Sequence, residues 1–78
     1  MANVIIYSTP TCGYCRIAKQ FFTENKVAYV EKDVSTDAVA REEFMKKSNG
    51  QNAVPLIDVD GTIMIGFDKA KLAQLLGL

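Results

Sequence analysis

Apolar and polar positions along this chain repeat with two different periods, which separate short strands from amphipathic helices. Residues 4–7 are all apolar or aromatic and are followed by the turn-forming segment 8–11, so they predict a buried strand that ends in a turn. From residue 13 to residue 24 the apolar side chains return at helical spacing, and Asn25 offers a stop. The apolar face of this predicted helix holds Ile17, Ala18, Phe21 and Phe22, and its polar face holds Arg16, Lys19, Gln20 and Glu24.

The middle of the chain repeats the order of a strand followed by a helix. Residues 27–33 alternate loosely enough for a second strand, and residues 35–37 supply helix-capping side chains before Ala38. The second helix is predicted to run to about Ser48, where Asn49-Gly50 is a left-handed stop. Its modest apolar face is formed by Ala40, Phe44 and Met45. The pairs Glu42–Lys46 and Glu43–Lys47 have favourable i,i+4 spacing, and we interpret these charges as a solvated face.

The last third of the chain predicts a hairpin and a final helix. Residues 56–59 and 62–65 are apolar runs separated by Asp60-Gly61, a dipeptide suited to a type I′ turn between antiparallel strands. Asp68 is a suitable cap for the last helix. In that helix Leu72, Leu75 and Leu76 face one way, and Lys69, Lys71 and Gln74 face outward.

The predicted order of elements is βαβαββα, which defines an α/β fold. A βαβ unit makes its first two strands parallel through a right-handed crossover, and the hairpin must complete the sheet. The result is a four-stranded mixed sheet flanked by three helices, an order that fits the thioredoxin-like fold. Pro55 precedes the third predicted strand, where a cis peptide bond is a tolerable turn device. We expect residues 1–78 to form a single domain, because so short a chain supports only one core.

The overall charge and the N-terminal residues exclude several kinds of partner. Nine basic residues balance nine acidic ones, so electrostatics recruit neither nucleic acid nor an anionic membrane. The first residues carry no basic segment, and the apolar run at 4–7 is far shorter than a signal or membrane-spanning segment. The sequence therefore predicts a soluble, cytoplasmic protein.

The chain holds two cysteines and no histidine, which narrows the chemistry further. Too few soft ligands are present for a zinc site within one chain, and no Cys-His or Ser-His pair can be built. Cys12 and Cys15 lie only three residues apart, so a structural disulfide between them would constrain the unfolded chain by only about 2 kcal/mol. We therefore interpret them as a redox pair for thiol-disulfide exchange, and we expect no metal site.

The position of the two cysteines at a helix start predicts unequal roles. Free N–H groups and the helix dipole stabilise a thiolate at Cys12, which lowers its pKa and makes it both the attacking thiol and a good leaving group. Cys15 lies one turn into the helix, so it should be more buried and act as the resolving thiol. Arg16 is either a solvated residue or a guide for an anionic thiol substrate.

Three segments together resemble the glutaredoxin family: Thr11-Cys12-Gly13-Tyr14-Cys15-Arg16, Ala53-Val54-Pro55 and Gly66-Phe67-Asp68. The resemblance covers essentially the whole chain. It implies an enzyme that reduces protein disulfides and protein-glutathione mixed disulfides, with glutathione as reductant and co-substrate and with no permanently bound cofactor. It also implies a groove for glutathione or a peptide, whose candidate residues are Thr11, Tyr14, Arg16, Gln51, Val54, Pro55, Gly66, Phe67 and Asp68.

The chain departs from the usual glutaredoxin pattern at several positions, and other functions stay open. Gly13 replaces a proline, Ala53 a threonine, Ile65-Gly66 a double glycine and Lys69 an acidic residue, while Thr9 stands where a basic residue is common. Gly66-Phe67 is also similar to NrdH-type redoxins, which accept electrons from thioredoxin reductase and serve ribonucleotide reductase. A glutathione-bound dimer that carries an iron-sulfur cluster and a non-catalytic adaptor are the remaining alternatives.

Overall fold

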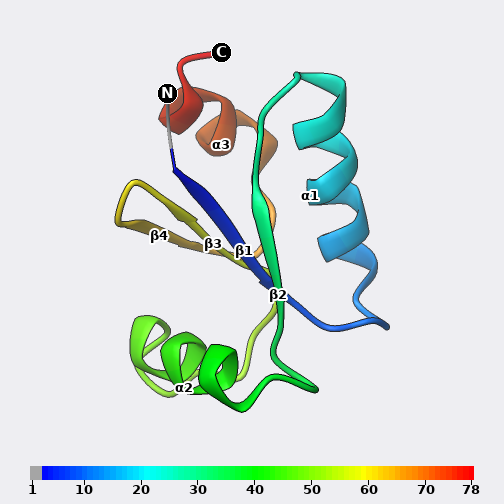
Figure 1. The fold of residues 1–78 in the computed structure, drawn as a ribbon. Helices are drawn as coiled ribbons and strands as arrows, with labels where there is room; N and C mark the ends of the chain where they lie inside the picture. The colour runs from blue at the N-terminus through cyan, green and yellow to red at the C-terminus, as the bar shows by residue number, and fades with distance from the viewer. Residues whose placement is uncertain (1–2) are drawn as a thin grey trace.

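The computed structural model describes residues 3–78 and has the predicted order of elements (Figure 1). The seven elements are β1 (Val4–Ser8), α1 (Gly13–Glu24), β2 (Val30–Asp33), α2 (Ala38–Lys47), β3 (Leu56–Val59), β4 (Thr62–Ile65) and α3 (Lys69–Leu76). The strands form one mixed sheet in the order β2-β1-β3-β4, in which only β1 and β2 are parallel. The predicted α/β fold is confirmed. The expectations for the extreme N-terminus and for a domain starting at residue 1 include residues 1–2, which lie outside the described residues.

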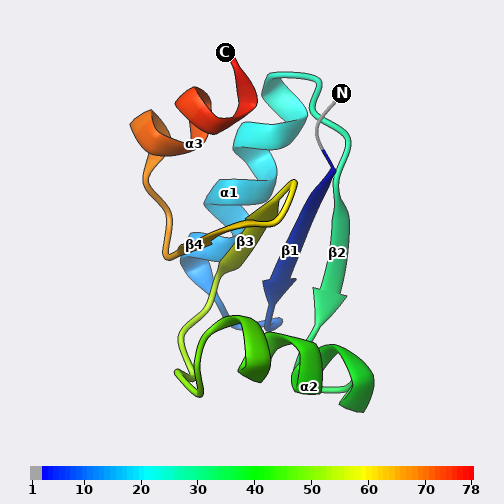
Figure 2. The same ribbon diagram turned by 90° about the vertical axis from the view of Figure 1, so that its left-hand side faces the viewer.

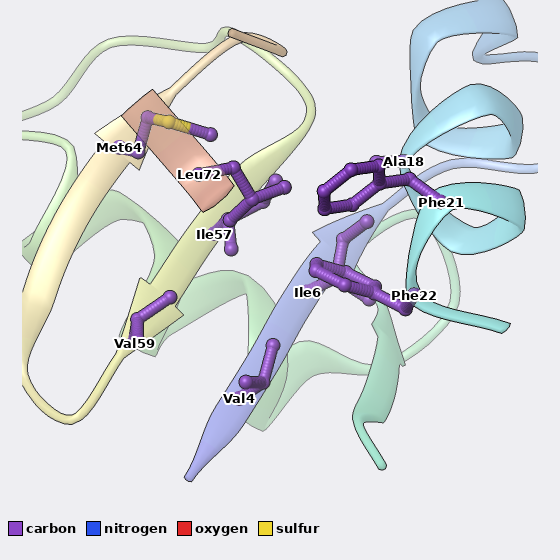
Figure 3. Close-up of a cluster of buried hydrophobic side chains, with 9 residues drawn as sticks. All are labelled: Val4, Ile6, Ala18, Phe21, Phe22, Ile57, Val59, Met64 and Leu72. Carbon is purple, nitrogen blue, oxygen red and sulfur yellow. The ribbon is translucent and has the colours of Figure 1, made fainter. Parts of the chain in front are cut away.

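The helices cover both faces of the sheet, with α1 and α3 on one face and α2 on the other (Figures 1 and 2). Side chains alternate between the faces along each strand, so Ile6 and Ile57 point toward α1 and α3 while Tyr7 and Leu56 point toward α2. Figure 3 shows the larger cluster, in which Phe22 of α1 lies against the sheet. Its buried members are Val4, Ile6, Ala18, Phe21, Phe22, Ile57, Val59, Met64 and Leu72.

The helix ends follow from the capping residues that the sequence placed there. Asp37 accepts hydrogen bonds from the N–H groups of Val39 and Ala40 at 3.0 and 3.1 Å, and Asp68 accepts one from Lys71 at 3.2 Å. Asn49 and Gly50 both have positive φ after α2, as predicted. These local interactions confirm the predicted starts of α2 and α3.

The hairpin turn also forms as predicted. Asp60 and Gly61 have φ values of 51° and 91°, the pattern of a type I′ turn. The N–H of Gly61 donates to Asp58 Oδ1 at 2.7 Å, and the N–H of Asn3 donates to Asp60 Oδ1 at 2.7 Å. The carboxylates of Asp58 in β3 and Asp60 in the turn thus hold the hairpin and link it to Asn3, just before β1.

The second strand begins three residues later than predicted. After α1 the chain makes a tight C-terminal turn in which the N–H of Val27 donates to the carbonyl of Phe22 at 2.8 Å. Lys26 has φ 57° in this turn, so the chain becomes extended only after it. Strand pairing with β1 begins at Val30, opposite Ile5. The prediction of a strand from residue 27 is wrong because the helix cap and the following connection occupy residues 26–29.

The prediction that Glu43 pairs with Lys47 on a solvated helix face is also wrong. Glu43 does not pair with Lys47, because Lys32 of β2 binds it at 2.9 Å. Lys47 instead reaches across to Asp58 of β3 at 2.8 Å. On α1, Lys19 is only partly exposed and binds Glu31 of β2 at 2.7 Å. Of the two predicted pairs within α2, Glu42–Lys46 forms, at 3.6 Å.

Lys26 provides a test of the turn after α1. A side chain with a Cβ is disfavoured at φ 57°, whereas glycine adopts this conformation readily. We expect Lys26→Gly to raise the free energy of unfolding by about 0.5–1 kcal/mol. Urea denaturation measures this change, with Lys26→Ala as the matched control that keeps a Cβ. Equal stability of the two variants would contradict the explanation.

Candidate functional site

Three segments that lie far apart in the sequence meet at one edge of the sheet. Tyr7, near the end of β1, is paired with Leu56, the first residue of β3, and Leu56 is paired in turn with Ile65, the last residue of β4. The segments that adjoin these ends are therefore neighbours: residues 9–15 after β1, residues 53–55 before β3 and residues 66–68 after β4. This is the same set of segments that carries the resemblance noted above.

Cys12 and Cys15 form a disulfide at the start of α1, with their Cα atoms 5.3 Å apart. Cys12 is the residue that caps the helix, and its backbone N–H donates to the carbonyl of Thr9 at 3.2 Å. The N–H of Cys15 donates to the Cys12 sulfur at 3.1 Å. The first turn of the helix thus places a donor and the positive end of its dipole at this sulfur. Within residues 3–78, Cys15 is the residue whose backbone N–H binds this sulfur, and the N–H of Tyr14 makes no such bond.

The two cysteines differ in exposure as predicted. Cys15 is 1% exposed because it lies on the buried face of α1 with Ala18 and Phe22. Cys12 is only partly buried and precedes the helix. A substrate disulfide therefore has access to Cys12, and Cys15 is positioned to react with the Cys12 sulfur.

Exposed apolar side chains follow the disulfide along α1. Tyr14 is 65% exposed and Ile17 is 48% exposed, one turn further along the same helix. The prediction that Ile17 belongs to the buried face is wrong, because the sheet-facing positions are taken by Cys15, Ala18, Phe21 and Phe22. The sequence signal for this strip is the i,i+3 spacing of Tyr14 and Ile17.

The other two segments are joined to each other by hydrogen bonding and packing. The Val54–Pro55 peptide bond is cis, and the carbonyl of Pro55 accepts a hydrogen bond from the N–H of Gly66 at 2.8 Å. Gly66 has φ 87°, a conformation that suits glycine. Phe67 is partly buried and makes an edge-to-face contact with Phe21 of α1, with ring centroids 5.9 Å apart. The segment at 66–68 is therefore held both to the Pro55 loop and to α1.

The remaining candidate residues are all exposed. Thr11 and Arg16 are exposed on either side of the disulfide, and Arg16 forms no ion pair within residues 3–78. Gln51 lies in the connection before Pro55, where its N–H donates to the carbonyl of Ser48 at 3.3 Å. The exposed Asp68 uses one carboxylate oxygen to cap α3. The binding roles of these groove residues stay predictions.

Beside the site, a cluster of Lys19, Glu31 and Ser8 links α1 to the sheet. Glu31 of β2 accepts hydrogen bonds from Lys19 at 2.7 Å and from the buried Ser8 hydroxyl at 2.9 Å. The Lys19 hydrogen bond is the main reason that the pKa of Glu31 is lowered, while partial burial opposes the shift and Ser8 contributes to it. Because Ser8 ends β1 just before the loop that leads to Cys12, this cluster helps to fix the start of that loop.

Comparisons with known proteins agree with this arrangement. The sequence model of the glutaredoxin family matches residues 4–64. The chain belongs to the glutaredoxin family. Glutaredoxin 3 of Escherichia coli K12 is 40% identical over 68 residues, which are 87% of this chain and 81% of that protein. An uncharacterized glutaredoxin-like 8.6 kDa protein in the rubredoxin operon of Clostridium pasteurianum is 39% identical over 91% of this chain and 93% of its own length.

A solved structure extends this agreement to three dimensions. The crystal structure of the thioredoxin-like protein BC3987 superimposes with a TM-score of 0.86 at 37% identity, over 94% of this chain and 99% of the other. The thioredoxin-like fold is thus shown, and this glutaredoxin-family protein carries a CxxC disulfide at the start of its first helix. No group of three or more possible metal ligands and no helix able to cross a membrane occurs within the described residues 3–78.

The geometry at Cys12 predicts a measurable pKa difference in the reduced protein. The Cys15 N–H and the start of α1 favour the Cys12 thiolate, and burial disfavours a thiolate at Cys15. We expect the pKa of Cys12 to lie below that of a free thiol, about 8.5, and that of Cys15 to lie above it. Thiolate absorbance near 240 nm, titrated in Cys15→Ser and Cys12→Ser, gives the two values separately. A higher pKa for Cys12 than for Cys15 would contradict the assignment of roles.

Proposed function

We propose that this glutaredoxin-family protein reduces protein disulfides and protein-glutathione mixed disulfides, with glutathione as its reductant. The observation that carries the proposal is the disulfide itself, which joins a partly exposed Cys12 at a helix start to a buried Cys15. Relatives named as glutaredoxins support the choice of glutathione. Reduced substrates and oxidised glutathione are the expected products.

The proposed reaction begins with attack by the Cys12 thiolate on one sulfur of the substrate disulfide. The other substrate sulfur leaves as a thiolate and takes up a proton, and Cys12 is then held in a mixed disulfide. Cys15 loses its proton and attacks the Cys12 sulfur, which releases the second substrate thiol and closes the Cys12–Cys15 disulfide. Two molecules of glutathione return the two electrons in the reverse order and leave as one molecule of glutathione disulfide.

With a glutathione mixed disulfide a shorter route is available. The Cys12 thiolate attacks the glutathione sulfur, the protein thiol leaves, and a second glutathione attacks the mixed disulfide on Cys12 to form glutathione disulfide. This route does not need Cys15. The backbone of Val54, beside cis-Pro55 at the same sheet edge, is the proposed partner for the cysteinyl part of glutathione in a short β-like contact.

The test compares two sources of electrons. The wild-type protein and Cys15→Ser receive a small glutathione mixed disulfide, with electrons from either glutathione and its reductase or thioredoxin reductase. We expect turnover with glutathione in both proteins. Turnover of the wild-type protein only with thioredoxin reductase would overturn the choice of reductant and identify a NrdH-like redoxin.

A further inference from the structure

We propose that a pocket between α1 and the start of α3 selects the protein substrate, by binding a large apolar side chain about three residues from the substrate's reactive cysteine. The inference rests on the proposed disulfide reduction and adds a specificity site to it. The pocket is lined by Ile17, Gln20, Phe21, Glu24, Phe67 and Lys69. The chain that links β4 to α3 runs beside α1 here (Figure 2).

Half of the residues that line the pocket are apolar: Ile17, Phe21 and Phe67. The buried Phe21 meets Phe67 edge to face, and nearly half of the surface of Ile17 is exposed. The volume is about 220 Å³, below the range of roughly 300–1,000 Å³ that is usual for small-molecule sites. A single side chain of a larger partner is therefore a better match than a free metabolite.

The pocket is continuous with the reactive site. Tyr14 and Ile17 are neighbours on one face of α1, so an exposed apolar strip leads from the disulfide to the pocket. In the proposed binding mode, a protein segment whose cysteine reaches Cys12 lies along this strip. Burial of apolar surface there then stabilises the complex in which the reaction occurs.

Helix geometry sets the expected spacing in the substrate. The α1 residues that line the pocket are centred between residues 20 and 21. Because helical side chains lean toward the start of the helix by about one residue, the middle of the pocket lies near residues 19 and 20, about seven residues beyond Cys12, and a helix rises about 1.5 Å per residue. The separation along the helix is thus roughly 10 Å. An extended segment spans about 3.3 Å per residue, so the side chain in the pocket belongs to the third residue from the bound cysteine.

Two of the residues that line the pocket carry charges that are free to meet a partner. Glu24 and Lys69 form no ion pair within the described part of the chain, and Glu24 accepts a hydrogen bond from Gln20 at 3.0 Å. Binding pockets usually combine apolar lining residues with a few polar groups.

The experiment uses the pre-reduced protein in a single turnover, so no external reductant enters. Three peptides carry one cysteine in a mixed disulfide with 2-mercaptoethanol: one has Leu three residues before the cysteine, one has Leu three residues after it, and the reference has Ser at both places. Cys12 attacks the peptide sulfur and releases mercaptoethanol, and Cys15 then releases the peptide thiol as the Cys12–Cys15 disulfide closes. Chromatography after acid quenching measures the rates.

We expect one Leu peptide to react about fivefold faster than the reference, a difference that corresponds to partial burial of one apolar side chain. In Ile17→Ser this preference should fall below about twofold. The matched control is Val39→Ser, which alters another exposed apolar residue, on α2 and outside the pocket, and should retain the preference. Hydroxyethyl disulfide, which has no side chain to select, should react equally with all three proteins.

Equal rates for all peptides with the wild-type protein would overturn the pocket's role, and so would a preference that survives in Ile17→Ser. These failures are distinct from failure of the proposed function. If hydroxyethyl disulfide and every peptide remained oxidised in the presence of the reduced wild-type protein, disulfide reduction itself would be excluded. If they reacted without preference, only the specificity site would be excluded.

Discussion

Cys12→Ser should lower disulfide reduction by at least about a thousandfold, while Cys15→Ser should keep most of the activity toward a glutathione mixed disulfide. Cys12 is the partly exposed sulfur at the helix start, and serine in its place cannot form the mixed disulfide. Cys15 is buried, so it acts only after Cys12 has reacted. The measurement is steady-state turnover of each variant with the small mixed disulfide.

Cys12→Ser and Cys15→Ser should also behave differently when the substrate is a disulfide within one protein. Because both substrate sulfurs then belong to one molecule, release of the product depends on attack by Cys15 on the Cys12 sulfur. Cys15→Ser should therefore accumulate a covalent complex with the substrate that thiol reductants dissolve, and mass spectrometry detects it. The opposite pattern, with a trapped complex in Cys12→Ser, would show that the roles of the two cysteines are reversed.

Asp58→Ala should lower the free energy of unfolding by about 3 kcal/mol. Asp58 is 8% exposed on the face of the sheet that α2 covers, and Lys47 of α2 donates to it at 2.8 Å. Lys47 also donates to the hydroxyl of the buried Tyr7 at 2.7 Å, and the other Asp58 oxygen accepts the Gly61 N–H. Loss of the carboxylate leaves a partly buried ammonium without its counter-charge and a turn N–H without its acceptor.

Thermal and urea unfolding measure this effect, which for a domain of this size corresponds to roughly 12–24 °C in Tm. The matched control is Glu42→Ala. It removes the Glu42–Lys46 pair, whose side chains are 71% and 77% exposed, and it should cost less than about 0.5 kcal/mol. An Asp58→Ala variant as stable as Glu42→Ala would show that the Lys47–Asp58 pair does not hold α2 on the sheet.

The same ion pair predicts a dependence on alkaline pH. Burial of Lys47 disfavours its charge, but the hydrogen bonds to Asp58 and Tyr7 outweigh burial and raise the pKa of Lys47 above its ordinary 10.5. Because the pKa is higher in the folded state than in the unfolded state, the stabilisation is complete below pH 10.5 and is lost as pH rises further. The stability difference between wild type and Asp58→Ala should therefore shrink above that pH.

Much of the fold could be read from local sequence because the deciding interactions are local. Asp37 and Asp68 cap their helices through N–H groups two or three residues away, and Asp60-Gly61 forms its turn from two residues that tolerate positive φ. Cys12 and Cys15 likewise react with each other across a single helical turn. Such features depend on nearby residues only, so they can be predicted without knowing how the rest of the chain folds.

The errors occurred where a distant element decided the outcome. Helical periodicity placed Ile17 on the same face as Phe21. In the structure, the face of α1 that packs on the sheet is narrower than the apolar face of the helix, so Ile17 lies at the surface. The i,i+4 spacing paired Lys47 with Glu43, but a desolvated carboxylate on β3 is a stronger partner than one on the same exposed helix face. The start of β2 depended on its register with β1.

The sequence by itself determined the order of elements, the helix caps, the hairpin and the reactive pair, because each depends on residues within a few positions of one another. The tertiary structure alone decided which charges meet, which apolar residues stay exposed beside the disulfide, and how residues 53–55 and 66–68 come to lie at the sheet edge with Cys12. Strand register and helix packing set these relations, and both join residues that are remote in the sequence.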